Sequence, residues 1–320
     1  MTTILLPTSI PLAPDLPEGV NAVAYDVDAP LTDEHLAAEA LVTWGNPDDR
    51  LREAATRLTR LRWVQSLAAG PDHVLSVGFA PDVVVTSGRS LHDRPVAEHA
   101  LALVLASARR LDLAVRAQIG HRWAGELGGL QEGGNSERFT TLRGARVVVW
   151  GFGSIATTLA PLLEALGASV TGVARSGGTR SGYPVVTPGE LDRMLPDADV
   201  LVLILPATAG TRRSVDAGVL RLLPRGAWVV NVGRGATVDE EALVDALREG
   251  RIGGAALDVA AVEPLPVDSP LWDAPNVLIT PHAAGGRPLG ADELIAANIR
   301  ALLAGEPLRN VVERGGTGTG

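Results

Sequence analysis

Short apolar runs separated by turn residues recur along residues 1–93. They have the length of buried strands, and the amphipathic spacing of 32–39 and 47–59 between them predicts helices. Because strands that alternate with helices usually form a parallel sheet, this part of the chain is predicted to be an α/β domain. The predicted strands are Thr3–Leu6, Val20–Tyr25, Ala40–Trp44, Leu61–Leu67 and Val83–Thr86.

A different pattern follows Pro95. Residues 96–118 contain neither glycine nor proline and carry a wide apolar face, which predicts one long helix. The next stretch, 121–140, is rich in glycine and polar residues and is typical of an exposed connection. The long helix is therefore expected to bridge two α/β domains.

Strands and helices alternate again from Arg143 onward. Short strands with helical crossovers predict a second doubly wound parallel sheet. A helix over 289–303 and a disordered tail, GGTGTG, are expected to close the chain. The predicted strands are Val147–Trp150, Ser169–Ala174, Val200–Leu205, Ala227–Asn231, Ala255–Val259 and Asn276–Thr280. The predicted helices are Ser154–Leu166, Pro188–Leu195, Asp216–Leu222 and Asp239–Arg248.

The composition is that of a globular protein, with 46% hydrophobic and 20% charged residues. The chain has no cysteine, which rules out disulfides and cysteine-ligated metals and fits a reducing compartment. Its net charge of −9 makes nucleic acid and anionic membranes poor partners. The sequence has neither a signal-peptide pattern nor a long apolar span, so the expected location is the cytoplasm.

A glycine turn follows the strand Val147–Trp150, where Gly151-Phe152-Gly153 leads into a helix pattern. Gly151 is expected to make the tight turn and Gly153 to let the backbone approach a pyrophosphate. Ala156 stands where the fingerprint G-x-G-x-x-G has its third glycine, and it is small enough for close strand–helix packing. The alternative is a strand–helix turn without a ligand, but the context favours dinucleotide binding.

The end of the next strand bears on the choice of cofactor. An NAD site usually has an acidic residue there, whereas this chain has Arg175 and Ser176, with Arg180 close behind. A guanidinium and a hydroxyl bind a 2′-phosphate that a carboxylate would repel. The sequence therefore favours NADP(H), with NAD(H) as an open possibility. The alternative is that Arg175 is a solvated loop charge.

Three residues just past predicted strand ends have side chains that can take part in catalysis: Arg234, Glu263 and His282. In a doubly wound sheet such positions share one edge, where ligands bind. Arg234 can grip a carboxylate, His282 can deliver a proton, and Glu263 can orient the imidazole. Each alone is an ordinary surface or loop residue, but together they suit the reduction of a carbonyl group.

At these residues the chain resembles the D-isomer-specific 2-hydroxyacid dehydrogenases. The resemblance runs over nearly the whole chain and implies a catalytic trio of Arg234, Glu263 and His282. It implies a flavodoxin-like substrate domain, 1–93 with 284–320 returning to it, and a Rossmann cofactor domain, 94–283, with the cleft between them. The stretches that carry it are LRWVQSLAAGPDHV, RPVAEHALALVLASARRL, VVVWGFGSIA, LPATAGTRR, LLPRGAWVVNVGRGATVDEEAL, GAALDVAAVEPLP and PLWDAPNVLITPHAAG.

The resemblance implies further contacts. The N–H groups of Ala69 and Gly70 would meet the substrate carboxylate, and Asp258 would bind the nicotinamide carboxamide. The long helix would support a homodimer. Trp150 departs from the family, which usually has a small aliphatic residue before the glycines. Other cofactor contacts would lie at Ser154, Ile155, Pro206, Thr211, Val232 and Gly233.

The leading hypothesis is an NADP(H)-dependent reductase of small 2-oxo acids such as glyoxylate or hydroxypyruvate. Formate oxidation is disfavoured because formate dehydrogenases carry Gln where Glu263 stands. Phosphite oxidation on the same scaffold stays open, as does a nucleotide-sensing, dehydrogenase-like corepressor.

The remaining histidines show no metal-ligand spacing, so no metal site is predicted. His99 lies within the apolar helix pattern and is expected to be a packed helix residue. Trp44 and Trp123 are candidates to line the substrate pocket, although core packing explains them equally well. Arg89 is a weaker candidate for the cleft.

Overall fold

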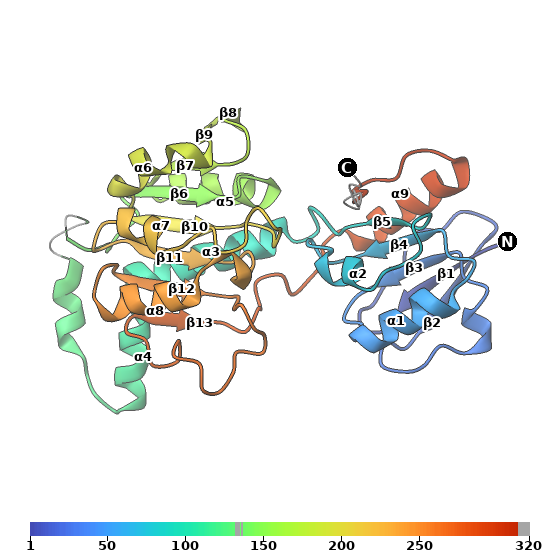
Figure 1. Ribbon diagram of the computed structural model, residues 1–320, viewed down its shortest axis with the longest axis horizontal. Helices are drawn as coiled ribbons and strands as arrows, with labels where there is room; N and C mark the ends of the chain where they lie inside the picture. The colour runs from blue at the N-terminus through green and yellow to red at the C-terminus, as the bar shows by residue number, and fades with distance from the viewer. Residues whose placement is uncertain (132–134, 136, 313–320) are drawn as a thin grey trace. The chain divides into compact units, whose positions relative to one another are not determined.

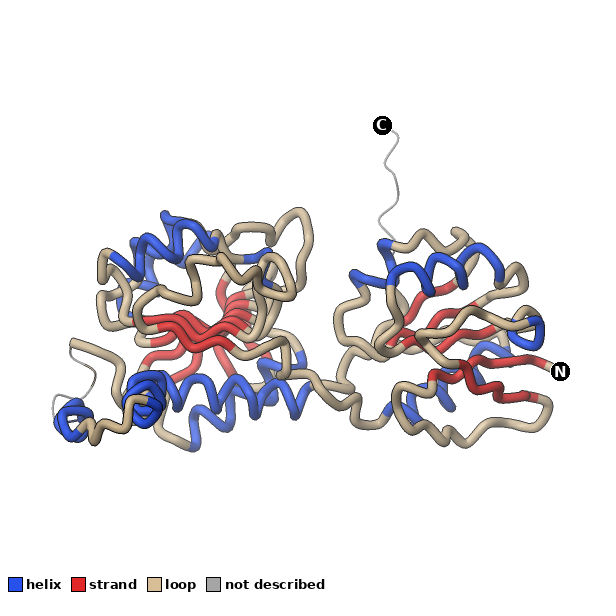
Figure 2. The backbone as a smooth tube through the Cα atoms, turned by 90° about the horizontal axis from the view of Figure 1, so that it is seen from below, coloured by secondary structure: helices blue, strands red, loops and turns tan. Residues whose placement is uncertain are grey.

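The computed structural model describes residues 1–131, 135 and 137–312, and the tail GGTGTG lies outside them. The chain forms two compact units, labelled by element in Figure 1. One comprises Met1–His92 with Arg287–Gly320, and the other Asp93–Gly286. In each, the sheet lies between layers of helices (Figure 2). No helix in the described ranges is long and apolar enough to cross a membrane.

The first unit has a five-stranded parallel sheet with the order β2-β1-β3-β4-β5. This is the flavodoxin-like order. Its strands are β1 (Thr2–Pro7), β2 (Val20–Tyr25), β3 (Ala40–Thr43), β4 (Trp63–Ser66) and β5 (Val84–Thr86). Its helices are η1 (Asp33–His35), α1 (Asp48–Arg57), α2 (Asp72–Ser76) and α9 (Ala291–Ala304).

Helix α9 completes this unit from the far end of the sequence. Its buried residues Ile295 and Ile299 belong to the same core cluster as Ile4, Val42 and Trp63 of the sheet. Because one face of the sheet would otherwise be uncovered, the unit needs this returning segment for its core.

The second unit has an eight-stranded sheet with the order β13-β12-β11-β10-β6-β7-β9-β8. From β9 to β12 this is the Rossmann order, with the switch point between β6 and β10. The predicted fold class, two doubly wound parallel-sheet domains, is confirmed. The strands are β6 (Arg146–Trp150), β7 (Ser169–Val173), β8 (Gly178–Arg180), β9 (Tyr183–Val186), β10 (Val200–Leu203), β11 (Trp228–Asn231), β12 (Gly254–Leu257) and β13 (Val277–Ile279).

In this unit, helices from several parts of the sequence pack on the sheet and share its hydrophobic core. Packed apolar side chains of α3 and α5 join those of β6 and β10 in one cluster, and those of α7 and α8 join the same sheet in another. The helical elements are α3 (Asp93–Ala108), α4 (Leu111–Ile119), η2 (Gly125–Gln131), α5 (Ser154–Ala165), η3 (Pro188–Glu190), α6 (Leu191–Met194), η4 (Leu195–Asp197), α7 (Ala217–Leu222), η5 (Gly235–Thr237) and α8 (Glu240–Arg248).

The prediction of one long helix over 96–118 is wrong, because the chain breaks between α3 and α4. Arg110 adopts a left-handed backbone with φ of 52°. Its guanidinium pairs with Asp112, donates to Asn276 at 2.6 Å and lies 5.6 Å from the Trp228 ring centre. These side-chain contacts offset the cost of the unusual backbone.

Two strands were not predicted. β8 pairs antiparallel with β9, and β9 pairs parallel with β7. The segment around them is rich in glycine and serine, which suggests a loop, and β8 is largely exposed, so it carries no hydrophobic signal. The predicted helix Pro188–Leu195 is a series of short helical turns, η3, α6 and η4.

Candidate active site

The glycine turn joins β6 to α5 at the switch point of the second sheet. Gly151 has φ of 103°, and a Cβ there would lie 2.3 Å from the carbonyl oxygen of Ile204. Only glycine fits such a position. A Cβ on Gly153 would meet nothing within 4 Å, so the start of α5 is open. Ala156 is fully buried against the sheet. An open helix N-terminus at this place fits a phosphate.

Ser154 and Ile155 form the first turn of α5, and both are half-buried. The Ser154 hydroxyl donates to the Asp93 carboxylate at 2.8 Å, which ties the start of α5 to the start of α3. The hydroxyl is therefore engaged within the protein.

Arg180 links the predicted 2′-phosphate residues to the glycine turn. Its Nη1 donates to the Phe152 carbonyl at 3.0 Å, and its Nη2 donates to the Ser176 hydroxyl at 2.9 Å. Arg175 and Ser176 are exposed beside it. The unpredicted strand β8 thus brings Arg180 to the turn, while Arg175 stays open to solvent.

Pro206 and Thr211 lie in one compact turn after β10. The Thr211 hydroxyl donates to the Pro206 carbonyl at 2.5 Å and accepts from the N–H of Thr208 at 2.9 Å. Val232 and Gly233 follow β11 and are buried, and the N–H of Gly233 donates to the Asn231 side chain at 3.0 Å. All four predicted residues therefore lie at the carboxyl ends of central strands.

Arg234 follows directly after Gly233. Its Nη1 donates to the Gly233 carbonyl at 2.8 Å, and its own carbonyl accepts from the Thr237 hydroxyl at 2.6 Å. A Cβ on Gly235 would lie 1.9 Å from the carbonyl carbon of Ala260. The loop that carries Arg234 is therefore pressed against the loop that leads to Glu263.

Glu263 and His282 form a hydrogen-bonded pair. Nδ1 of His282 lies 2.6 Å from Oε2 of Glu263, and Oε1 of Glu263 accepts from the N–H of Ala260 at 2.9 Å. The side chain of His282 is 46% exposed and that of Glu263 is 37% exposed, so both border solvent. Because an ionised carboxylate can only accept, the tautomer that suits this contact carries its proton on Nδ1, and Nε2 takes no part in the pair.

Asp258 follows β12 and is buried, with 1% of its surface exposed. Its Oδ1 accepts from the Thr280 hydroxyl at 2.5 Å and from the N–H of Ala283 at 2.9 Å, and its Oδ2 accepts from the N–H of Ala284 at 3.0 Å. Nε2 of His99 lies 3.2 Å from Oδ1. Among the described residues, Oδ2 accepts from a single N–H group, so this oxygen retains the capacity for one further hydrogen bond.

Sequence reasoning missed the contact of His99, which was expected to be a packed helix residue. The available signal was a polar side chain within an apolar helix face, which does not identify its partner.

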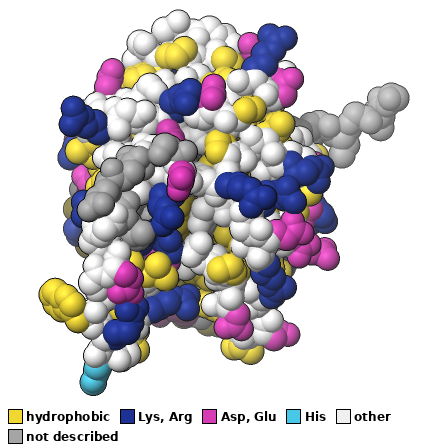
Figure 3. All heavy atoms as spheres, turned by 90° about the vertical axis from the view of Figure 1, so that its left-hand side faces the viewer, with side chains coloured by type: hydrophobic (Ala, Val, Ile, Leu, Met, Phe, Trp, Pro, Cys, Tyr) yellow, Lys and Arg dark blue, Asp and Glu magenta, His cyan; other side chains and the backbone are white. Residues whose placement is uncertain are grey.

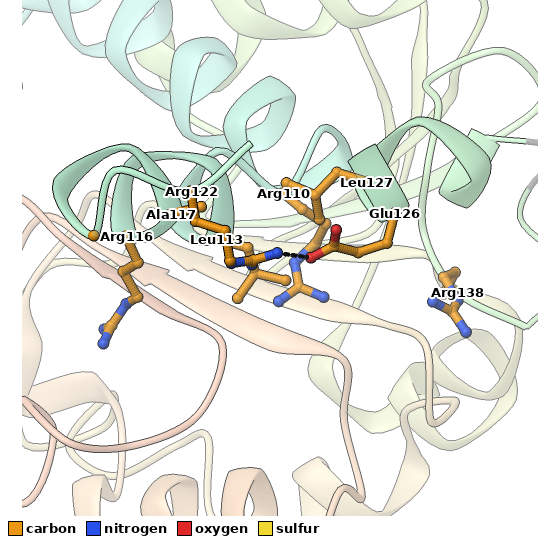
Figure 4. Close-up of a pocket in the computed structure, with 9 residues that line it drawn as sticks. Arg110, Leu113, Arg116, Ala117, Arg122, Glu126, Leu127 and Arg138 are labelled. Carbon is orange, nitrogen blue, oxygen red and sulfur yellow. Dashed lines mark hydrogen bonds and ion pairs between the residues drawn. The ribbon is translucent and has the colours of Figure 1, made fainter. Parts of the chain in front are cut away.

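A cavity of about 460 Å³ borders the Glu263–His282 pair. Its walls are mostly apolar, with Leu265, Leu271 and Trp272 among them. A larger hollow of about 540 Å³ lies between α4 and η2, where Arg122 and Glu126 face each other (Figure 4). The predicted site residues do not line this larger hollow.

Ala69 and Gly70 belong to the first unit, in the loop between β4 and α2. The start of this loop contacts His92, whose Nε2 lies 2.7 Å from the Leu67 carbonyl oxygen. The ring of His92 also stacks on Trp44, with 5.5 Å between ring centres. Among the described residues, no hydrogen-bond acceptor meets the N–H of Ala69 or Gly70.

The described residues contain no cluster of three or more metal-ligating side chains. Instead, the second unit combines a Rossmann sheet, an open glycine turn at its switch point, and an Arg, a Glu and a His at neighbouring strand ends. This combination defines a dehydrogenase that uses a nicotinamide dinucleotide.

Comparison with known proteins specifies the family. Residues 101–284 match the family model of the D-isomer specific 2-hydroxyacid dehydrogenase, NAD binding domain. Glyoxylate/hydroxypyruvate reductase A of Klebsiella pneumoniae (strain 342) is 34% identical over 289 residues, which cover 87% of this chain and 86% of that protein. The chain therefore belongs to the D-isomer specific 2-hydroxyacid dehydrogenase family, and the predicted family and enzyme class are confirmed.

Two solved structures of related enzymes are similar to this chain over nearly its whole length. A D-isomer specific 2-hydroxyacid dehydrogenase from Xanthobacter autotrophicus Py2, in complex with NADPH and MES, is 32% identical with a TM-score of 0.80, and 98% of each chain is covered. An NADPH-dependent glyoxylate/hydroxypyruvate reductase from Sinorhizobium meliloti, in complex with NADP and sulfate, is 26% identical with a TM-score of 0.79, again with 98% of each chain covered.

Proposed function

We propose that this protein reduces small 2-oxo acids, such as glyoxylate or hydroxypyruvate, to 2-hydroxy acids with NADPH. The observation that carries the proposal is the 2.6 Å contact between His282 and Glu263, in the unit that bears the open glycine turn. The names of the K. pneumoniae and S. meliloti relatives support the same substrate class.

His282 acts as the general acid. The bound cofactor supplies hydride chemistry at the substrate carbon. His282 delivers a proton from Nε2 to the carbonyl oxygen, which becomes the hydroxyl. Glu263 holds the proton on Nδ1, keeps the ring in place and offsets the charge of the imidazolium.

Arg234 and the first unit bind the substrate carboxylate in this proposal. The guanidinium of Arg234 grips it and polarises the neighbouring carbonyl. The N–H groups of Ala69 and Gly70 donate to a carboxylate oxygen, as the family resemblance implies. The absence of an acceptor for these two groups among the described residues supports that role.

Arg175 and Ser176 give the preference for NADPH over NADH. Both are exposed at the end of β7, and Arg180 fixes the Ser176 hydroxyl beside the glycine turn. A guanidinium at this position attracts the 2′-phosphate that NADH lacks. The contacts of the remaining proposed cofactor residues, Ser154, Ile155, Pro206, Thr211, Val232, Gly233 and Asp258, follow the family pattern.

A panel of substrates tests the proposal. The purified protein is mixed with 2-oxo acids of increasing side-chain size and either NADPH or NADH, and the loss of absorbance at the nicotinamide band is followed. We expect turnover of glyoxylate or hydroxypyruvate with NADPH. If no 2-oxo acid is reduced while phosphite reduces NADP⁺, or while the cofactor binds without any turnover, the proposal is wrong.

We also propose that the protein is a homodimer built on α4. Apolar side chains on this helix and the turn after it face solvent, namely Leu111 (48% exposed), Val115 (52%), Ile119 (75%) and Trp123 (96%). Figure 3 shows this side of the molecule, where apolar side chains lie among arginines. Several exposed apolar side chains on one helix are typical of an interface, and the family resemblance makes a second copy the expected partner.

A further inference from the structure

Helix α3 presents one polar side chain, His99, to the carboxyl ends of β12 and β13. Nε2 of His99 lies 3.0 Å from the Thr280 hydroxyl and 3.2 Å from Oδ1 of Asp258. The side chain is 23% exposed, whereas that of Asp258 is 1% exposed. An acidic group so deeply buried is stable only with several donors. His99 reaches this group from a different layer of the fold through the Thr280 hydroxyl, which itself donates to Oδ1 of Asp258.

Asp258 in turn holds the backbone that carries His282. Its carbonyl accepts from the N–H of His282 at 2.7 Å, and its carboxylate accepts from the next two N–H groups, those of Ala283 and Ala284. His282 itself has a left-handed backbone, with φ of 50°. For a residue with a side chain this conformation persists only where the surroundings impose it.

We propose that His99 is a positioning residue for His282, acting through the carboxylate of Asp258 and the hydroxyl of Thr280. The inference rests on the proposed role of His282 as the general acid. His99 anchors Asp258 to the rigid helix α3, and Asp258 keeps three successive N–H groups in place. The left-handed turn then directs Nδ1 of His282 at Glu263. Without this anchor, the Thr280 hydroxyl loses its partner on α3, and the turn that Asp258 and Thr280 hold loosens.

Displacing a general acid by a fraction of an ångström to 1 Å lowers turnover strongly. His99→Met has a similar volume but no donor, so we expect kcat to fall on the order of 10- to 100-fold. The KM for NADPH is expected to change less than kcat, although Asp258 is also a proposed cofactor residue, because the main effect of His99 is on the position of the proton donor. His99→Gln, whose amide can donate from the same place, is expected to restore most of kcat.

Nuclear magnetic resonance supplies a readout that does not depend on turnover. The imidazole signals of His282 are assigned in histidine-labelled protein by their loss in His282→Asn. We expect His99→Met to shift the His282 signals and His99→Gln to leave them close to the wild type. Glu98→Gln is the matched control, because Glu98 is the exposed neighbour on the same helix and pairs only with Arg94 in the described structure. Thr280→Val is the second variant if His99→Met does not fold.

The outcomes separate this inference from the proposed function. If the wild type reduces no 2-oxo acid, the proposed function fails and the His282 signals alone decide the positioning role. If His99→Met matches Glu98→Gln in kcat and leaves the His282 signals unmoved, the inference is wrong. It is also wrong if His99→Met chiefly raises the KM for NADPH, because His99 would then act on the cofactor.

Discussion

The tertiary structure explains the bulky side chain of Trp150. The sequence offers no reason for a bulky residue before the glycine turn. In the structure its side chain is 6% exposed and belongs to the core cluster of Val173, Leu203 and Leu205. The residue fills a space between the ends of three neighbouring strands, and only their order in the sheet reveals that space.

His282→Ala tests the general acid. Removing the imidazole leaves no group to protonate the carbonyl oxygen, so we expect kcat to fall by about 10²- to 10⁴-fold. Glu263→Gln keeps a hydrogen-bond acceptor but loses the charge that stabilises the imidazolium, so its loss should be smaller. Steady-state kinetics with the best 2-oxo acid measures both. A kcat near that of the wild type in His282→Ala would remove His282 from the proton transfer.

Arg175→Asp tests the choice of cofactor. A carboxylate in place of the exposed guanidinium repels a 2′-phosphate and accepts from a 2′-hydroxyl, so preference should move from NADPH toward NADH. The ratio of kcat/KM for the two cofactors measures this, and we expect a change of at least about tenfold. Arg60→Asp, at an exposed arginine of the first unit, is the control. Equal ratios in Arg175→Asp and the control would exclude a contact of Arg175 with the phosphate.

Individual elements differ in how far local pattern determines them. The strands of both parallel sheets follow from short apolar runs, because burial on both faces leaves a signal in consecutive residues. The break between α3 and α4 leaves no such signal. Residues 96–118 have helical periodicity throughout, and Arg110 turns left-handed through contacts with Asn276 and Trp228, which lie far away in the sequence.

Helix α1 is attached to the rest of the first unit by an ionic cluster. Glu53 accepts from Arg57 and from Arg50, each at 2.7 Å, and from the N–H of Leu31 at 3.3 Å. The hydrogen bond from Arg57, followed by those from Arg50 and Leu31, outweighs burial and lowers the pKa of Glu53 below its ordinary value. A carboxyl group whose pKa falls on folding adds stability above its unfolded pKa, and this stability is lost as the pH falls through the folded pKa.

Glu53→Gln is therefore expected to destabilise the protein by about 1 kcal/mol at pH 7. The difference from the wild type should shrink as the pH falls from the ordinary pKa of glutamate, about 4.3, down through the lower pKa of Glu53 in the folded protein, where the wild-type carboxyl becomes protonated. Urea unfolding at a series of pH values measures this. Glu241→Gln, on the exposed start of α8, is the control and should show little effect. A difference that does not depend on pH would mean that the charge of Glu53 plays no part.

At the scale of the whole molecule, the exposed apolar residues of α4 predict self-association. Val115→Glu places a charge in the proposed interface, and an unpaired charge there is strongly unfavourable. Light scattering after size exclusion should give the mass of two chains for the wild type and one for this variant. Val267→Glu, at a residue that is 99% exposed outside α4, should remain dimeric. A monomeric wild type, or a dimeric Val115→Glu, would contradict the proposed interface.

The sequence by itself determined the two α/β parts, the glycine turn and the identity of the Arg, Glu and His at the strand ends. These are recognisable because hydrophobic periodicity and turn chemistry act between neighbouring residues. It also placed His282 and Glu263 at one sheet edge, because the ends of parallel strands meet there.

Only the tertiary structure decided how that edge is held together. His99 and Thr280 are 181 residues apart in the sequence, and their contact exists because α3 packs across the sheet of the second unit. The left-handed residues Arg110 and His282 depend on similar distant partners, Asn276 and Asp258. Contacts between distant segments leave no local pattern, because their free energy is gained only when the layers pack.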